Sequence, residues 1–366
     1  MFPNHATTVN KNIKKHNKQV DKNIPSAELI DFLYDNDLPE GVDVSLSSLN
    51  ECDSVWDAHR LDAYHMGNIY ALNSEFERYS DRIVDCSGFL KFGYNENGLI
   101  LKQAYFCKLR YCAVCQWRKS LFWKAMMYQT YDRIIQTHPT HRFVFLTLTV
   151  KNPKITDIAD TLKHMNNAWS KLKKRASFES VVTGWVRTTE ITRPKDETAN
   201  THAHPHFHAI LMVDPSYFGR NYIKQANWVA MWRSCLKVDY DPVIDIRTVK
   251  PKKGAIDNGM RGAIAETLKY AVKPAEVIKN ADTEQGREWF YELTRQTHKK
   301  RFVASGGLLK DALKKNKDEK DAEKVANEDM IATGNDDEIT ETDDRRLNFT
   351  FYPTKAGYFY NPNYNE

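Results

Sequence analysis

The segment that most constrains the fold is His204–Val213, where histidines run directly into an apolar stretch, HPHFHAILMV. If it forms a β-strand, alternation places His206 and His208 on one face together with Ile210 and Met212. Two imidazoles two residues apart on a strand then point the same way, as two ligands of one metal ion must. Imidazole suits Zn, Mn, Fe or Cu. The alternative is a polar strand face whose histidines meet solvent or each other.

The pattern around this strand predicts an α+β fold with an antiparallel sheet. The expected elements, in chain order, are a strand at 144–150, a helix at 156–174 with Thr156 as N-cap, strands at 181–191 and 204–213, a helix at 221–236 and a strand at 243–249. The order β-α-β-β-α-β is the split arrangement of ferredoxin-like and RRM-like domains. A further helix at 260–273 would lie across the exposed face of the sheet.

Two carboxylates and a tyrosine extend the histidine pair into a candidate reaction centre. Glu190, on the strand that should pair with 204–213, becomes a third metal ligand if the register places it opposite the histidines. Otherwise it is an exposed strand residue. His204 is either an additional ligand or a neighbour that supports one.

On the expected helix at 260–273, Glu266, Tyr270 and Lys273 share one face. Tyr270 would be a nucleophile whose phenolate is favoured by Lys273, with Lys269 nearby, and Glu266 a general base for a different nucleophile. The alternative is a Glu–Lys surface pair beside a tyrosine at the rim of the core.

The N-terminal half predicts a helix at about 56–80, strands at 83–93 and 99–106 joined by a turn at 95–98, and a helix at 115–136. Its cysteines are too few for a disulfide scaffold. The spacing of Cys107, Cys112 and Cys115, with Cys86 upstream on the hairpin, predicts a structural Zn²⁺ site. The alternative is buried cysteines without a metal.

Basic and aromatic residues surround this cysteine run. Arg110, Arg118 and Lys119, with Trp117 and Trp123, form a mixture suited to phosphate contact and base stacking. They could equally be a solvated helix face and core tryptophans.

Charge is distributed unevenly along the chain. Residues 318–344 hold 12 acidic side chains against two lysines, a net charge of −10 that leaves about +15 for the rest of the chain. A basic body is expected for a phosphate-rich partner. The sequence shows neither a signal peptide nor an apolar run of roughly 20 residues, so we expect a cytoplasmic protein without a membrane partner.

Three motifs in this order resemble those of replication initiators from small rolling-circle bacterial plasmids, members of the HUH endonuclease superfamily. They are Phe145–Thr149 (FLTLT), His204–His208 (HPHFH) and Lys269–Lys273 (KYAVK). The resemblance covers about residues 83–310, including the cysteine run and a late Arg301-Phe-x-x-x-Gly306-Gly307.

The resemblance implies that Tyr270 attacks one phosphodiester of single-stranded or extruded origin DNA, leaving a 5′-phosphotyrosyl link and a free 3′-OH. His206, His208 and Glu190 would hold Mn²⁺ or Mg²⁺. Glu266 fits the position from which the single-tyrosine branch activates water to end the cycle. Plasmid origin DNA, a host helicase and a host DNA polymerase are the implied partners.

Four segments are therefore expected. They are a largely disordered basic segment at 1–55, a helical, Cys-rich zinc-binding and DNA-contact region at 56–138, an HUH endonuclease domain at 139–310, and an acidic low-complexity tail at 311–366.

Two groups of alternatives stay open. A conjugative relaxase or a single-tyrosine transposase shares the nicking chemistry, although the Cys-rich segment and the single Glu-x-x-x-Tyr favour the initiator. From another class, a zinc-containing DNA-binding regulator would bind without cutting.

Overall fold

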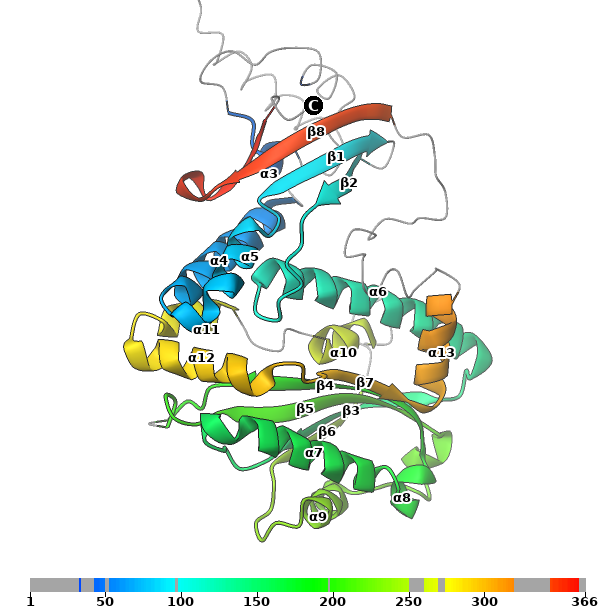
Figure 1. The fold of residues 1–366 in the computed structure, drawn as a ribbon. Coiled ribbons are helices and arrows are strands. Elements are labelled where there is room, and N and C mark those ends of the chain that lie inside the picture. The colour runs from blue at the N-terminus through cyan, green and yellow to red at the C-terminus, as the bar shows by residue number, and fades with distance from the viewer. Residues whose placement is uncertain are drawn as a thin grey trace, which may run out of the picture. The chain divides into compact units, whose positions relative to one another are not determined.

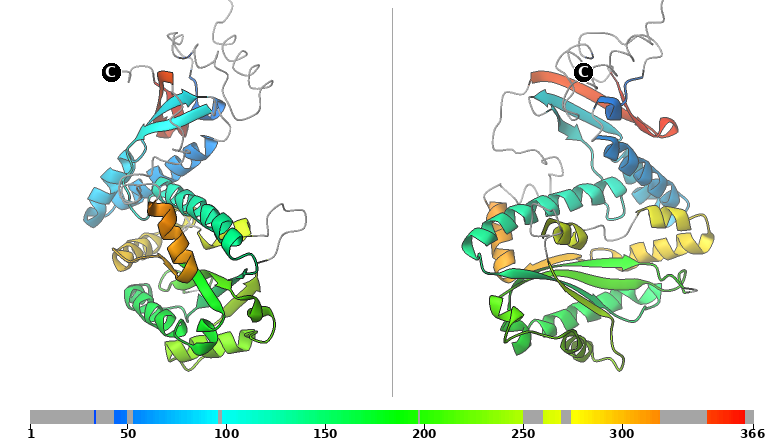
Figure 2. Two further views of the ribbon diagram at one scale, coloured as in Figure 1. Left: turned by 90° about the vertical axis from the view of Figure 1, so that its right-hand side faces the viewer. Right: turned by 180° about the vertical axis from the view of Figure 1, so that it is seen from behind.

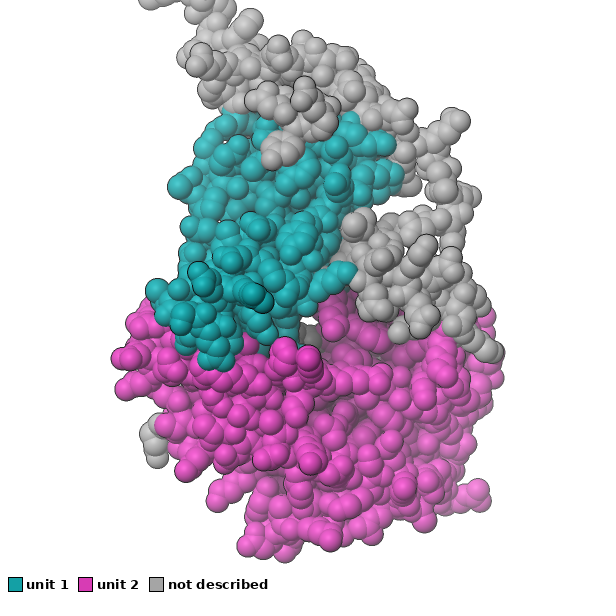
Figure 3. All heavy atoms as spheres, in the orientation of Figure 1, with its two compact units in different colours: residues 1–118, 328–366 teal, residues 119–327 magenta. Residues whose placement is uncertain are grey.

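The computed structural model describes Leu33 and residues 43–49, 53–95, 98–196, 198–249, 260–268, 274–318 and 343–361. The chain divides into two compact units, coloured separately in Figure 3. Unit 1 comprises Met1–Arg118 and Glu328–Glu366, and unit 2 comprises Lys119–Asn327. Both contain an antiparallel sheet and helices, so the expected α+β class is confirmed. None of the helices in the described ranges combines the length and the apolar character that a membrane span needs.

Unit 2 is built on a five-stranded sheet with the order β6-β3-β5-β4-β7, in which every neighbouring pair is antiparallel. The strands are β3 (Arg142–Thr149), β4 (Val182–Thr192), β5 (His204–Val213), β6 (Ile244–Thr248) and β7 (Val303–Gly306). α7 (Ile158–Leu172), preceded by a 3₁₀ turn (Ile155–Asp157) and followed by α8 (Ala176–Glu179), leads from β3 to β4. A 3₁₀ turn (Pro215–Phe218) and α9 (Gln225–Leu236) lead from β5 to β6. The edge strand β7 has no counterpart in the expected elements.

The two faces of this sheet pack against different helices (Figure 1, Figure 2). Phe207 of β5 points to the side of α7 and α9, where its ring lies 6.5 Å from that of Trp169 and 6.4 Å from that of Trp232. Ile210 and Met212 point the other way, into an apolar cluster with side chains from α6 (Ala113–Thr137), α10 (Met260–Thr267) and α13 (Gly307–Asp318). By alternation, His206 and His208 belong to the α10 side.

The expected helix at 260–273 is described only in part. α10 spans Met260–Thr267, and its Ile264 packs in the cluster on the histidine face, with Leu268 directly after it. Residues 269–273, including Tyr270 and Lys273, lie outside the described residues. The chain is described again from α11 (Pro274–Asn280), followed by α12 (Glu284–Thr297). Proline at the start of α11 fits because the first helical turn needs no N–H donor there.

Unit 1 corrects two expected boundaries. The single helix expected at 56–80 is two helices, α4 (Ser54–Ala71) and α5 (Glu77–Asp85), separated by a 3₁₀ turn (Ser74–Phe76). The side chain of Asn73 accepts a hydrogen bond from the Glu75 N–H and so caps this turn. The strand expected from residue 83 begins six residues later, as β1 (Phe89–Asn95), and pairs with β2 (Gly98–Ala104).

The C-terminal residues 343–361 differ from the acidic tail expected for 311–366. They form β8 (Asp343–Tyr352), a 3₁₀ turn (Pro353–Lys355) and β9 (Gly357–Tyr360), which complete a sheet of order β2-β1-β8-β9. Leu347, Phe349 and Phe351 alternate along β8 and are buried, which is the pattern of a strand packed on one face. Composition concealed this pattern, because the acidic run ends only at Asp344.

The rest of the expected tail is described only in part. Residues 311–318 continue α13, and 319–342 lie outside the described residues. Within the segment 1–55, expected to be largely disordered, Val44 is buried, as are Leu46 and Leu49 of the short α3 (Leu46–Leu49). Most of that segment lies outside the described residues.

Candidate functional sites

The strand register brings a carboxylate to the histidine pair. β5 lies between β3 and β4, with His206 directly opposite Glu190 of β4 and His208 directly opposite Thr147 of β3. This is the register that the sequence required for Glu190 to meet the histidines. The three side chains converge on the face of the sheet against which α10 packs, and all three residues are buried.

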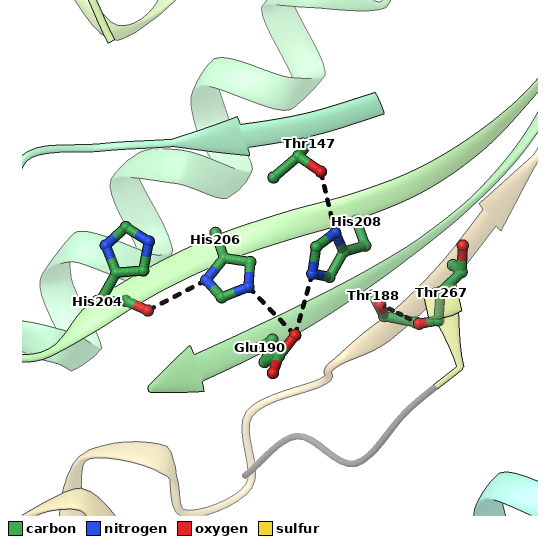
Figure 4. Close-up of polar contacts among 7 residues, drawn as sticks. All are labelled: Thr147, Thr188, Glu190, His204, His206, His208 and Thr267. Carbon is green, nitrogen blue, oxygen red and sulfur yellow. Dashed lines mark hydrogen bonds and ion pairs between the residues drawn. The ribbon is translucent and has the colours of Figure 1, made fainter. Parts of the chain in front are cut away.

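The convergence is tight. Glu190 Oε2 lies 3.1 Å from His206 Nε2 and 3.0 Å from His208 Nε2, as Figure 4 shows. All three residues are buried, at 8–9% exposure. One ligand atom from each lies within 4.8 Å of the other two. Two imidazole nitrogens and a carboxylate form a donor set that suits a divalent cation and leaves coordination positions open.

The far nitrogen of each ring is held in place. His206 Nδ1 donates to the His204 carbonyl oxygen at 3.2 Å, and His208 Nδ1 lies 3.1 Å from Thr147 Oγ1. Because a carbonyl only accepts, Nδ1 of His206 carries the proton. In the neutral ring Nε2 then presents a lone pair to a carboxylate oxygen. Two acceptors at that distance need a cation or a second proton between them, so the arrangement fits a metal ion.

The charge of Glu190 supports the same assignment. Burial raises the pKa of this carboxyl. Hydrogen bonds from His206 and His208, and their charge when they are protonated, lower it by more, so its net pKa lies well below the ordinary value. The group is therefore an anionic ligand at neutral pH. Burial, with the charge of His206, also lowers the pKa of His204. His204 Nδ1 lies 2.7 Å from Asn152 Oδ1, and its carbonyl is what orients His206.

A hydrogen bond ties the end of α10 to this face of the sheet. Thr188, two residues before Glu190 on the same side of β4, donates its Oγ1 to the Thr267 carbonyl at 2.5 Å (Figure 4). Both threonines are buried. Glu266 is half-buried on α10. The sequence analysis assigned no role to Thr147 or Thr188. Strand alternation, which places Thr188 on the same face as Glu190, was the signal available for it.

Replacing Thr147 with valine should weaken Mn²⁺ binding by roughly 10–100-fold, because the hydroxyl that orients His208 is lost while the β-branched shape remains. Calorimetric titration with Mn²⁺ measures the effect. Thr189→Val is the control, since it makes the same side-chain change at a buried position on the opposite face of β4. Equal Mn²⁺ affinity in the two variants would contradict a positioning role for Thr147.

The second candidate site is a cluster of four cysteines within unit 1. Cys86 follows the end of α5, and Cys107, Cys112 and Cys115 lead into α6. Cys86 Sγ lies 3.5 Å from Cys112 Sγ and 3.6 Å from Cys115 Sγ, which is also 3.6 Å from Cys107 Sγ. Zinc–thiolate bonds of about 2.3 Å imply an S···S separation of about 3.8 Å in a tetrahedron, whereas a disulfide would need about 2.05 Å. The cluster fits Zn²⁺.

The cysteines of the cluster differ in their pKa values. Hydrogen bonds within the cluster and burial raise the pKa of Cys112 and of Cys115, so these two thiols need a cation to become thiolates. Hydrogen bonds from Cys107, Cys112 and Cys115 lower the pKa of the Cys86 thiol. Arg82 donates to the Cys107 carbonyl, and the Tyr358 hydroxyl of β9 donates to the Ser87 carbonyl at 2.6 Å, directly beside Cys86. The loop that carries the first cysteine is therefore fixed from the C-terminal strands.

Arg118 differs from the expected DNA contact. Its guanidinium is buried, 4.7 Å above the ring of Phe106 and 5.2 Å above that of Trp56. Burial lowers its pKa to about 10, while negative charge on Cys115 and Cys86 opposes that shift. A cation in this position offsets the excess negative charge that four thiolates give a zinc site.

The other expected DNA contacts have mixed surroundings. Lys119 is exposed, and Arg110 is half-buried, with its pKa lowered by burial. Trp117 stacks on His59 with ring centroids 4.8 Å apart, and Trp123 packs against the apolar cluster of unit 2. Both tryptophans are half-buried and pack against other side chains of the protein.

Comparisons with known proteins complete the description. A family model described as a replication protein, Rep_1, matches residues 98–359. A "Protein rep" of Streptococcus pneumoniae is 34% identical over 312 residues, covering 84% of this chain and 92% of the relative. A "Protein rep" of Lentilactobacillus hilgardii is 34% identical over 64% of this chain and 74% of its own length. A "Replication protein" of Staphylococcus aureus is 33% identical over 50% of this chain and 77% of its own length. No solved structure matches the chain.

Proposed function

Because this chain belongs to the Rep_1 family of plasmid replication initiators, we propose that it starts rolling-circle replication by nicking one strand of its plasmid origin. The observation that carries this proposal is the convergence of Glu190, His206 and His208 on the sheet face that α10 covers. A single-stranded or extruded origin segment is the substrate, and the family resemblance supplies a host helicase and polymerase as later partners.

Glu190, His206 and His208 would hold Mn²⁺ or Mg²⁺. When bound, the cation would polarise the scissile phosphate and stabilise charge on the departing 3′ oxygen. Glu190 contributes the negative charge, and the His204 carbonyl and Thr147 keep both imidazoles aimed at the centre. Burial of the three side chains limits competing water ligands and strengthens their electrostatic effect on a bound phosphate.

The nucleophile in this proposal is the Tyr270 hydroxyl. Its oxygen forms a bond to phosphorus as the bond from phosphorus to the 3′ oxygen breaks. The phenolic proton passes to solvent, the 3′ oxygen leaves with the electron pair and is protonated, and Lys273 favours the phenolate. The position of Thr267 supports this assignment, because its carbonyl accepts a hydrogen bond from Thr188 on the histidine face of the sheet. Tyr270 follows it by three residues, and three residues span at most about 11 Å.

Glu266 would end the cycle by activating a water molecule against the phosphotyrosyl bond. Glu266→Ala should nick at a rate close to that of the original protein, but release of the covalent adduct should slow by roughly 10²–10⁴-fold, the usual contribution of a general base. Quenched time courses of the adduct on denaturing gels measure the two steps separately. Glu276→Ala, which removes an exposed carboxylate from α11, is the control. Unchanged release in Glu266→Ala would contradict this role.

The proposed function is tested with supercoiled plasmid that carries the origin, in Mn²⁺ and in EDTA. Nicking should give open circles with covalently attached protein and a 3′ end that a polymerase extends, in Mn²⁺ only. A plasmid without the origin should stay supercoiled. A non-catalytic DNA-binding regulator would retard the origin fragment on a gel without opening any circle, and that result would overturn the proposal.

A further inference from the structure

Four basic side chains gather along the β4–β7 edge of the sheet in unit 2. Lys173 follows α7, Arg187 lies on β4, Arg301 precedes β7, and Lys310 lies on α13. They are close enough to repel one another. The charges of Arg187 and Lys310 act on Lys173, and the charge of Arg301 acts on Arg187. Arg301 belongs to the late sequence motif, which the nicking chemistry leaves without a role.

Within the described part of the chain, these four basic side chains have no aspartate or glutamate as an ion-pair partner. Arg301 Nε donates to the Val303 carbonyl at 2.8 Å, which leaves its charge unneutralised. Repulsion among like charges costs stability unless an anion offsets it.

Arg187 is the most informative member. It is only 3% exposed, and its guanidinium lies 3.8 Å above the ring of Phe207. Nη2 donates to Asn166 Oδ1 at 2.7 Å, but Nε and Nη1 are buried without an acceptor. Burial, with the charge of Arg301, lowers the pKa of Arg187 to about 10. The guanidinium also lies 5.5 Å from the ring of Trp169. A buried cation held over aromatic rings without a carboxylate is costly, and an anion bound nearby would offset that cost.

We propose that Lys173, Arg187, Arg301 and Lys310 bind the phosphodiester backbone of a DNA strand at the β4–β7 edge. Arg301 and Lys310, which are exposed, and half-buried Lys173 contact phosphate oxygens. Arg187, which is buried, adds positive charge to the site. The site rests on the proposed function only in taking DNA as its ligand.

The contact is independent of base sequence. Lys173 Nζ lies 4.8 Å from the centroid of the Trp185 ring, and the rings of Trp185 and Trp169 are in T-shaped contact. Gly306 lies so close to Trp185 that a Cβ there would come within 2.5 Å of the indole. Trp169 is buried and Lys173 lies over the Trp185 ring, so the cluster presents charge rather than a stacking surface, and backbone phosphates carry no direct sequence information. Since Arg187 and Glu190 lie on opposite faces of β4, this edge holds a part of the strand other than the scissile phosphate.

The test is the salt dependence of binding to a fluorescent single-stranded oligonucleotide without origin sequence, in EDTA so that cleavage does not enter. Lys173→Ala and Arg301→Ala should each lower the slope of log K against log salt by about 0.7 and weaken binding about 5–10-fold at low salt. Lys163→Ala, which removes an exposed charge from α7 outside the cluster, is the matched control. Both test side chains reach solvent, so these variants avoid the folding risk of replacing Arg187.

If Lys173→Ala and Arg301→Ala gave the same slope of log K against log salt as Lys163→Ala, the proposal would be overturned. Stabilisation of the original protein by inorganic phosphate at matched ionic strength, without any change in DNA binding in the two variants, would assign the cluster to free phosphate instead and would also overturn it. Nicking of the origin plasmid in Mn²⁺ is scored separately. Unchanged salt slopes would therefore overturn the DNA-backbone site without affecting the proposed function, and loss of nicking would overturn the proposed function without affecting this site.

Discussion

Tyr270→Phe should yield no covalent protein–DNA adduct and should reduce nicking of origin plasmid at least about a thousandfold, as expected when a nucleophile is removed. The substitution deletes one oxygen atom and keeps the aromatic ring. Water cannot replace the phenol in forming a phosphotyrosyl bond. The adduct is therefore the decisive measurement, read as radiolabelled DNA that remains with the protein on a denaturing gel.

Origin binding by Tyr270→Phe should stay near that of the original protein, because binding depends on phosphate and base contacts rather than on the phenol. Tyr222→Phe is the control, since it deletes a hydroxyl from an exposed tyrosine. An adduct formed by Tyr270→Phe at the original rate would assign the attack to another residue. Loss of both binding and the adduct would indicate misfolding and would require a thermal melt before interpretation.

Cys112→Ser should abolish stoichiometric zinc and unfold unit 1. A structural Zn²⁺ contributes on the order of 10 kcal/mol in small domains, comparable to the roughly 5–15 kcal/mol that holds a whole domain together. A hydroxyl is a poor replacement for a thiolate, and it leaves three buried sulfur atoms close together with Arg118 beside them. Zinc content by atomic absorption and protection from protease within residues 53–118 measure the outcome.

Cys235→Ser is the matched control. Cys235 is as buried as Cys112, but it lies on α9 and outside the cluster. The Cys235→Ser variant should keep its zinc, and its unit 1 should stay folded. Full zinc content and unchanged protease resistance in Cys112→Ser would show that the cluster is a set of packed thiols rather than a metal site.

Sequence pattern predicted the core of unit 2 because its signals are local. The strands β3, β4 and β5 were predicted from alternation and apolar runs. The register that matches Glu190 with His206 was left open by the sequence and is given by the structure. The edge strand β7 was not predictable. Its four residues, Val303–Gly306, are too few for a periodic signal, and it is defined by pairing with Trp185–Thr188 far earlier in the chain.

The candidate sites divide in the same way. Cysteine spacing and the histidine pair were visible because metal ligands must be particular residue types. The supporting contacts were not, since Thr147 and Thr188 acquire their partners only through folding. Arg118 shows the opposite failure. Composition placed its charge on a DNA-facing surface, whereas packing on Phe106 and Trp56 buries it beside the sulfur atoms.

The sheet of unit 1 takes β1 and β2 from one end of the chain and β8 and β9 from the other. During translation, a ribosome would release the cysteine run long before Tyr358 can reach Ser87. A nascent or truncated polypeptide ending before residue 343 would have every sulfur ligand and the whole of unit 2, yet β1 would remain an open edge. Premature termination would thus give a product with the cleavage residues but an unfinished cysteine unit, so that completing synthesis becomes a condition for a fully assembled initiator.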